Sequence, residues 1–143
     1  MNDKDVKLAS DLAVATVRLA RHLRLRRATS LVSLTQLSAL ATLEREGPMT
    51  PGAMAATERV QPPSMTRVIA SLADLGMVRR EPHPTDGRQV IVTLSEQGGE
   101  VIRDEKNARE AWLRDRLSRL SDDDAAVLRR AVGIMGDLVN DED

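Results

Sequence analysis

The sequence predicts a mainly α-helical protein that carries one small two-stranded β-hairpin. Hydrophobic residues make up 41% of its 143 residues, but aromatic residues only 1%. A core built from aliphatic side chains suits packed helices better than an aromatic-rich β-sandwich. Apolar residues recur at spacings of three and four along most of the chain, and a period of two is confined to residues 77–94. The length is that of one ordinary domain that can bury a core.

The first two helices are predicted from an apolar stripe and from a capping pattern. A long helix is expected over about residues 3–28. Its apolar stripe is Leu8, Leu12, Ala15, Leu19 and Leu23. A second helix is expected to begin at Ser33, because Ser33 and Gln36 have the spacing of a capping box, and to end at Gly47. Its buried face is expected to be Leu37, Leu40, Ala41 and Leu43.

Two short helices follow, separated by a tight turn. Thr50 is expected to cap the third helix and Pro51 to occupy its first turn. Because Pro62–Pro63 cannot lie in the middle of a helix, residues 59–61 are the expected turn, and the fourth helix runs from there to Gly76. The expected buried residues are Met54, Ala55 and Ala56 in the third helix, and Met65, Val68, Ile69, Leu72 and Leu75 in the fourth. The outward face of the fourth helix is expected to carry Ser64, Thr66, Arg67, Ala70, Ser71 and Asp74.

A β-hairpin is predicted after the fourth helix, with strands at residues 77–81 and 89–94. Val90, Val92 and Leu94 are expected to alternate on one side of its second strand. The Asp86-Gly87 pair is expected to supply a turn with positive φ, and the turn places Arg88 at the tip. Two helices, a tight turn and a hairpin with a basic tip follow the order of a winged helix-turn-helix, whose second helix can enter the major groove of DNA.

Two more amphipathic helices are expected at the carboxyl end. Ser95 caps the first, which runs to about residue 119 and is weakened by Gly98-Gly99 by about 1 kcal/mol per glycine. Ser121 caps the second, and its expected buried stripe is Val127, Leu128, Ala131, Ile134, Met135 and Leu138. Residues 31–94 alone could not cover the apolar faces of the long helices, so we expect two chains to pair rather than one chain to form a monomeric bundle. The expected division is therefore an N-terminal dimerisation helix at 1–30, a winged helix-turn-helix domain at 31–94 and C-terminal dimerisation helices at 95–143.

Composition and charge exclude several functions. Without cysteine the chain has no disulfide framework and no thiolate zinc site, and two histidines far apart make a weak case for any metal. No glycine-rich phosphate loop and no ordered nucleophile–base arrangement is present, so we expect no enzyme activity and no cofactor. No apolar run is long enough to cross a bilayer, and the expected location is the cytoplasm. The net charge is −1, but residues 18–27 carry five arginines and no acid, whereas the carboxyl end is rich in aspartate. This sorting suggests one polyanion-facing surface, although the arginine run taken alone is more typical of a solvated helix face.

Residues 33–99 resemble the MarR (multiple antibiotic resistance regulator) family of bacterial winged-helix repressors. The matching segments are Leu34-Thr35-Gln36-Leu37, Met54-Ala55-Ala56, Ser64-Met65-Thr66-Arg67, Leu72 with Leu75-Gly76-Met77-Val78, Arg79-Arg80-Glu81-Pro82, Asp86-Gly87-Arg88 and Val92-Thr93-Leu94-Ser95-Glu96-Gln97-Gly98. The wing of the family usually contains Asp-Arg-Arg, whereas this chain has Gly87 at the middle position. One basic contact of the wing is therefore expected to be weaker here, while the outer Asp86 and Arg88 remain.

The resemblance implies a homodimer, joined by its first, fifth and sixth helices, that represses from a pseudo-palindromic operator. It also implies release of DNA when a small phenolic or otherwise lipophilic anion binds, and a location in the bacterial cytoplasm, on the nucleoid when bound to DNA. The oxidant-sensing members of the family use cysteine, and this chain has none.

The residues that we expect to contact DNA lie on the fourth helix and the wing. Ser64, Thr66 and Arg67 occupy the first turns of the helix, where base edges are met. Arg88 suits the minor groove, and Asp86 is expected to orient the turn or Arg88. Possible contacts to the DNA backbone come from Thr35, Gln36, Arg79 and Arg80. Capping the second helix is at least as strong an expectation for Thr35 and Gln36, and one arginine could pair with Glu81.

Other interpretations are open at this point. Arg67 could pair with Glu58 on the surface instead of binding DNA. Arg18 and His22 could line an effector site, or could lie on an exposed helix face, and Trp112 is expected to serve packing. The alternative function is a winged-helix module that binds another protein and not DNA. Arg67 and Arg88 favour DNA, because both would be idle in a module that binds only protein.

Overall fold

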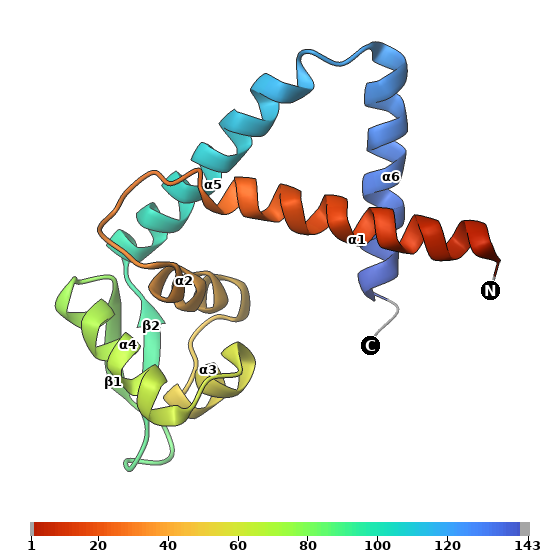
Figure 1. Cartoon of the computed structure of the whole chain (residues 1–143). Helices are drawn as coiled ribbons and strands as arrows, with labels where there is room; N and C mark the ends of the chain where they lie inside the picture. The colour runs from red at the N-terminus through yellow and green to blue at the C-terminus, as the bar shows by residue number, and fades with distance from the viewer. Residues whose placement is uncertain (1, 141–143) are drawn as a thin grey trace. The chain divides into compact units, whose positions relative to one another are not determined.

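The computed structural model describes residues 2–140 and confirms the expected mainly helical fold with one β-hairpin (Figure 1). The elements are α1 (Asp3–Arg24), α2 (Leu34–Glu46), α3 (Pro51–Glu58), α4 (Pro62–Asp74), β1 (Val78–Pro82), β2 (Val90–Leu94), α5 (Glu96–Leu117) and α6 (Asp122–Asn140). The two strands are antiparallel, with Val78 opposite Leu94 and Pro82 opposite Val90. Within the described part of the chain they form the whole sheet.

The chain divides into two compact units. One unit is Arg24–Ala108, and the other contains the described residues 2–23 and 109–140. The functional division expected from the sequence, with boundaries at 30 and 94, stays a prediction.

The local signals at the helix ends are confirmed. Ser33 and Gln36 form a complete capping box, and Thr50 accepts a hydrogen bond from the amide of Ala53. Gly76 follows α4 with φ 73°, a left-handed conformation that glycine adopts without strain. The amide of Gly76 bonds the carbonyl of Ala73 and that of Met77 bonds Leu72, which together make a Schellman motif. These bonds turn the chain directly from α4 into β1.

The hydrophobic core of the Arg24–Ala108 unit lies between α2, α3, α4 and the hairpin. Its buried members are Val32, Leu37, Ala39, Leu40, Leu43, Met54, Ala55, Met65, Ile69, Leu72, Met77, Val78 and Val92. No aromatic side chain is among them, so the core is aliphatic and sulfur-containing, as the composition predicted. Burial of each valine, leucine, isoleucine or methionine side chain stabilises the fold by roughly 1.5–3 kcal/mol before the loss of conformational entropy is counted.

Several individual expectations about burial are wrong. In α2 the three leucines are buried as expected, and Ala39 and Thr42 are buried in addition to them. Ala41, which was expected to be buried, is only half-buried. The reason is that α2 packs against α3, α4 and β2 together, which buries a wider sector than one stripe. Ala56 is exposed, and Leu75 is 42% exposed because it caps α4 at the point where the chain turns away.

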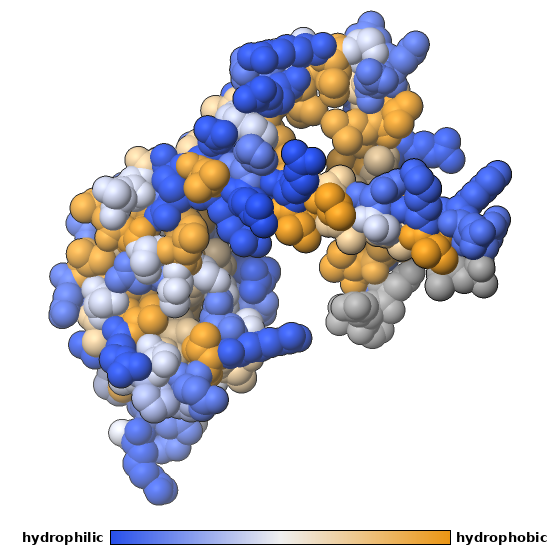
Figure 2. Space-filling model, in the orientation of Figure 1, coloured by the Kyte–Doolittle hydropathy of each residue, from blue (hydrophilic) through white to orange (hydrophobic). Residues whose placement is uncertain are grey.

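The terminal helices bury nothing completely within one chain. Neither α1 nor α6 has a buried residue, so the expected burial of the α6 stripe is wrong for a single chain. Figure 2 shows hydrophobic side chains gathered on the surface along α6. The large exposed ones there are Val127, Leu128, Val132, Ile134, Met135, Leu138 and Val139.

Gly98 has a packing role that the sequence analysis missed. A Cβ at this position would overlap the carbonyl oxygen of Met77 and press on Leu94. The same junction is held by Ser95, whose hydroxyl donates to the Gly76 carbonyl at 2.6 Å and accepts from the Gly98 amide at 3.1 Å. The glycine that lowers helix propensity is therefore the residue that allows α5 to begin against β1.

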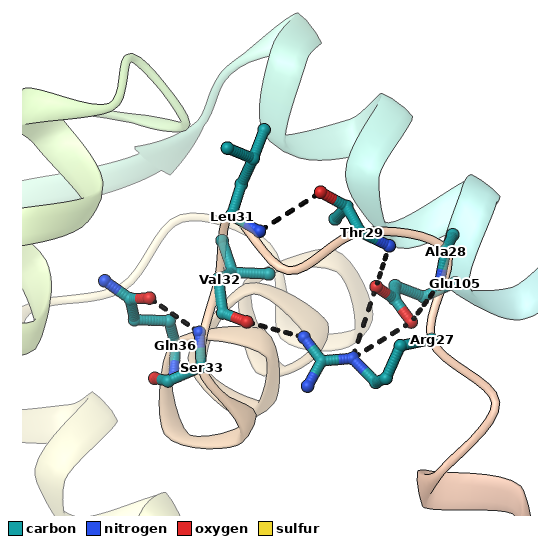
Figure 3. A network of polar contacts seen from close by, with 8 residues as sticks. All are labelled: Arg27, Ala28, Thr29, Leu31, Val32, Ser33, Gln36 and Glu105. Atoms are coloured by element: carbon teal, nitrogen blue, oxygen red, sulfur yellow. Dashed lines mark hydrogen bonds and ion pairs between the residues drawn. The ribbon is translucent and has the colours of Figure 1, made fainter.

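A buried carboxylate ties the segment before α2 to α5 (Figure 3). Glu105 is 1% exposed, and it accepts from the amides of Ala28 at 3.3 Å and Thr29 at 3.4 Å. The carboxylate also pairs with Arg27, whose Nε lies 3.4 Å from Oε2 and whose Nη2 donates to the Val32 carbonyl. Because the amides of Ala28 and Thr29 bond this carboxylate and not helix carbonyls, α1 ends at Arg24 and not near residue 28 as expected.

Replacing Glu105 should destabilise the protein strongly. Glu105→Ala leaves the Arg27 guanidinium and the two amides without their acceptor, so we expect the free energy of unfolding to fall by about 3 kcal/mol. Chemical denaturation followed by circular dichroism measures this change. Asp104→Ala is the matched control, because Asp104 is the exposed neighbour on the same helix. Equal unfolding midpoints for the two variants would contradict a structural role for the Glu105 cluster.

Candidate nucleic-acid interface

The position of α4 is set by the turn that precedes it and by its buried face. Arg59 ends α3 in the left-handed region with φ 55°, and the amide of Val60 bonds the carbonyl of Ala55. Pro62 then begins α4, as predicted. The helix buries Met65, Ile69 and Leu72 against the core. A helix held by one buried stripe presents the opposite face to solvent.

The exposed face of α4 carries the three residues expected to meet base edges. Thr66 and Arg67 are exposed and Ser64 is half-buried. The Thr66 hydroxyl donates to the Pro62 carbonyl at 3.0 Å, and Arg67 Nη2 lies 3.5 Å from the Ser64 hydroxyl. The partners in both contacts are uncharged groups on the same helix. Neither contact neutralises the positive charge of Arg67.

The alternative ion pair between Arg67 and Glu58 is not the arrangement observed. Glu58 accepts hydrogen bonds from the hydroxyls of Ser38, at 2.7 Å, and Thr42. Both hydroxyls come from α2, so Glu58 ties α3 to α2. Glu58, the acidic residue considered as the partner of Arg67, is therefore hydrogen-bonded between α2 and α3.

The wing, defined as residues 78–94, ends in a tip organised by Asp86. The Asp86 carboxylate accepts from the Arg88 amide at 3.1 Å and from the Gln89 side-chain amide at 3.2 Å. The guanidinium Nε of Arg88 lies 3.9 Å from Asp86 Oδ1, and its side chain is 97% exposed. Asp86 therefore orients the turn and the backbone of Arg88, as expected.

The expected positive φ at Gly87 is wrong. Among residues 2–140 a positive φ occurs at Gly47, Arg59 and Gly76. The tip is instead held by side chains that bond backbone amides, namely Asp86 and His83. His83 Nδ1 accepts from the amide of Asp86 at 3.0 Å, a role that the sequence analysis did not assign. Nδ1 also accepts from the amide of Thr85, and this spacing of two residues, as in Asx and Ser/Thr turns, was the available signal.

The candidate contacts to the DNA backbone divide into two groups. Thr35 and Arg80 are exposed. Gln36 uses its side-chain oxygen to accept from Ser33 and its side-chain nitrogen to donate to Ser71 at 2.9 Å, which links α2 to α4. Gln36 therefore acts within the fold.

Arg79 lies on β1 and forms the ion pair that the sequence analysis considered for one of the two arginines. Its Nε lies 3.7 Å from Glu81 Oε1, and both side chains are more than half exposed. An exposed pair of this kind contributes little, about 0–1 kcal/mol. Breaking it to bind a phosphate would therefore cost little.

Arg18 and His22, the candidate effector residues, both lie on α1. The His22 ring stacks on Trp112 with ring centroids 6.1 Å apart and an interplanar angle of 6°, and the Arg116 guanidinium lies 5.2 Å from the Trp112 ring. Trp112 thus packs, as expected. Arg18 lines a shallow pocket of about 370 Å³ with Ala13, Val14, Val17 and Arg21, and His22 is not part of it.

Two kinds of feature are absent from the described residues. Among residues 2–140 no group of histidine and acidic side chains is arranged to hold a metal ion. No helix in the same range has the length and apolar character needed to cross a membrane.

Comparison with known proteins agrees with this geometry. The model of the MarR family matches residues 32–90. The chain is 56% identical over 141 residues, 99% of each chain, to an uncharacterized HTH-type transcriptional regulator of Mycobacterium leprae. It is similar to the crystal structure of a putative transcriptional regulator from Pseudomonas aeruginosa, with a TM-score of 0.83, 28% identity and coverage of 97% and 98% of the two chains.

A MarR family protein from Bacillus stearothermophilus has the same fold, with a TM-score of 0.79 and 23% identity over 98% of this chain and 99% of the other. The family consists of transcriptional regulators and not of enzymes. With the helix-turn-helix of α3 and α4 and the wing behind it, the chain is a DNA-binding transcriptional regulator that belongs to the MarR family.

Proposed function

We propose that the protein is a homodimeric repressor that binds a pseudo-palindromic operator, with α4 in the major groove and the wing in the minor groove. The observation that carries this proposal is the pair of exposed guanidinium groups, Arg67 on α4 and Arg88 on the wing. Both belong to elements whose opposite sides are fixed in one core. Repression, as opposed to activation, is the role that the family resemblance implies.

On α4, Arg67 has the chemistry to read guanine. A guanidinium can donate two hydrogen bonds to O6 and N7 of guanine in the major groove, which is worth roughly 1–3 kcal/mol against a wrong base. Ser64 and Thr66 lie in the same first turns, where their hydroxyls can reach a base edge or a phosphate. Because Pro62 and Pro63 have no amide hydrogens, the helix end binds phosphate less through its backbone and depends more on these side chains.

On the wing, Arg88 is the proposed minor-groove contact. Narrow A·T-rich minor grooves concentrate negative potential and attract arginine. Asp86 fixes the Arg88 amide but lies 3.9 Å from its Nε, too far for a strong hydrogen bond. The guanidinium can therefore leave Asp86 for the groove at little cost. Arg80 and Thr35, both exposed, are the proposed contacts to the DNA backbone, with Arg79 available once it leaves Glu81.

The proposal of a dimer is supported by the apolar faces of the terminal helices. Neither α1 nor α6 has a buried residue within one chain, and apolar patches of this extent mark interaction surfaces. Joining two copies through these helices would cover the surface and place two copies of α4 about a two-fold axis. A symmetric pair matches a pseudo-palindromic operator, with half-sites roughly 34–36 Å apart.

An effector is part of the proposal. We expect a small aromatic or lipophilic anion to release the DNA. The pocket that Arg18 lines combines aliphatic walls with a guanidinium, which suits an anion that has an apolar body. His22, stacked on Trp112, offers an aromatic surface on the same helix. Challenge of the DNA complex with a panel of aromatic acids tests this point.

Removal of the wing arginine should weaken DNA binding. Selection of bound fragments from genomic DNA supplies the operator. Arg88→Ala is then expected to weaken binding to it about tenfold while the dimer stays intact, because a well-placed arginine contact is worth 1–3 kcal/mol. Fluorescence anisotropy measures the affinity. The control is Arg45→Ala, since Arg45 is an exposed arginine on α2 that pairs with Glu46. Equal affinities for the two variants would remove the wing from the mechanism.

Operator binding should fall steeply with salt. A dimer that neutralises six or more phosphates is expected to lose affinity about a thousandfold between 50 and 200 mM salt, because counterions are released on binding. Titrations at four salt concentrations give the slope. A flat response would instead favour the alternative function, a winged-helix module whose partner is a protein.

An acidic residue on the apolar face of α6 should dissociate the dimer. Ile134 is 52% exposed in the single chain, so Ile134→Glu costs a monomer little but places a charge in the proposed interface. Analytical ultracentrifugation is expected to show a dimer for the wild type and a 15.7 kDa monomer for the variant. Arg129→Glu, five residues before Ile134 and therefore on a different side of α6, should remain dimeric. A wild-type protein that sediments as a monomer would contradict the proposed homodimer.

A further inference from the structure

We propose that His83 is the positioning residue of the wing: its neutral imidazole holds the tip in the shape that presents Arg88, and protonation of the ring releases that shape. The inference rests on the proposed function, in which the wing contacts DNA. It adds a residue that the sequence analysis left without a role, and it makes operator binding sensitive to pH.

The hydrogen bonds of His83 fix the protonation state of its ring. Nδ1 lies 3.2 Å from the amide nitrogen of Thr85 and 3.0 Å from that of Asp86. Backbone amides can only donate, so Nδ1 must be the acceptor of both bonds. A ring nitrogen that accepts carries no proton. The observed tip therefore requires a neutral imidazole with its single proton on Nε2.

A continuous set of contacts leads from this ring to Arg88. The imidazole holds the amide of Asp86, and the Asp86 carboxylate in turn holds the amide of Arg88 at 3.1 Å and the side chain of Gln89 at 3.2 Å. The tip is closed by the amide of Gln89, which bonds the Asp86 carbonyl at 3.1 Å. Since Gly87 does not supply a left-handed turn, the tip depends on these side-chain bonds.

The charged groups near His83 come from the turn itself and from β1. Asp86 and Arg88 lie in the same turn, and Arg79, Arg80 and Glu81 lie on β1. The amino end of α3, which lines a pocket with Arg88, contributes Thr50, Pro51 and Gly52, and none of these is titratable. Histidine is the residue type whose ordinary charge change lies between about pH 5 and pH 8.

The direction of the pH effect follows from competition for one lone pair. A proton on Nδ1 would face two amide hydrogens, so both hydrogen bonds must break before the ring can be protonated. The ordered tip is therefore favoured when the ring is neutral and is lost when the ring is protonated, that is, toward lower pH. An added positive charge alone would act in the opposite sense and raise the affinity for DNA. The sign of the pH effect thus separates positioning from simple charge.

The test compares operator affinity at pH 8.0 and pH 5.5 at constant ionic strength, with a genomic DNA fragment that the wild-type protein selects at pH 8.0. We expect the wild type to bind about five- to tenfold more weakly at pH 5.5, on the scale of one or two net hydrogen bonds. His83→Asn keeps an acceptor oxygen at the place of Nδ1 and cannot be protonated there. It should bind like the wild type at pH 8.0 and keep that affinity at pH 5.5.

Two further variants make the comparison specific. His83→Ala lacks the acceptor and should bind weakly at both pH values. Arg45→Ala, at the exposed arginine of α2 that pairs with Glu46, should retain the pH response of the wild type. A wild-type affinity that is unchanged or higher at pH 5.5, or an equal loss in His83→Asn, would overturn the inference.

A measurement on the free protein keeps the two proposals distinguishable. If no genomic fragment is retained at any pH, the proposed function fails, and the inference is then decided by nuclear magnetic resonance alone. The amide signals of Thr85 and Asp86 should move as the pH falls from 8.0 to 5.5 in the wild type and stay in place in His83→Asn. Amide signals that stay in place while the His83 ring titrates would contradict the positioning role.

Discussion

The interface depends on the burial of one side of α4. Met65, Ile69 and Leu72 pack into an aliphatic core shared with α2, α3 and the hairpin, and this contact decides which face of the helix is left exposed. The same core contains Val92 of β2, so helix and wing are held by one set of contacts. Arg67 and Arg88 thus belong to one body, in which a change to the core would move both of them.

The terminal helices α1 and α6 differ from α4, because most of their large apolar side chains are exposed in the single chain. The two features complement each other in the proposed repressor: one unit presents a fixed face to DNA, and the other requires a second copy. Glu105 belongs to the first unit and holds the segment that follows α1, through the amides of Ala28 and Thr29. Its buried charge is costly, and such groups persist where they specify a conformation.

The sequence predicted features that arise from local chemistry. The capping box at Ser33, the turn before Pro62 and the glycine after α4 all follow from short-range preferences, and they were placed to within a residue or two. Features that join distant residues, or a side chain to a backbone amide, left no periodic signal. Gly98 against Met77 and Glu105 beneath the segment at Ala28 are of the first kind, and His83 is of the second. The error at Gly87 has the same origin, because the turn is held by side chains and not by a left-handed glycine.

The most direct test of the account is the base preference of an Arg67→Ala dimer, measured by selection from a randomised operator library alongside the wild type. If α4 reads the major groove through Arg67, the variant should lose preference at one base pair in each half-site, at a cost of roughly 1–3 kcal/mol for the preferred base. The preferences at the remaining positions should be kept. An Arg67→Ala dimer with the affinity and base preferences of the wild type would contradict the account.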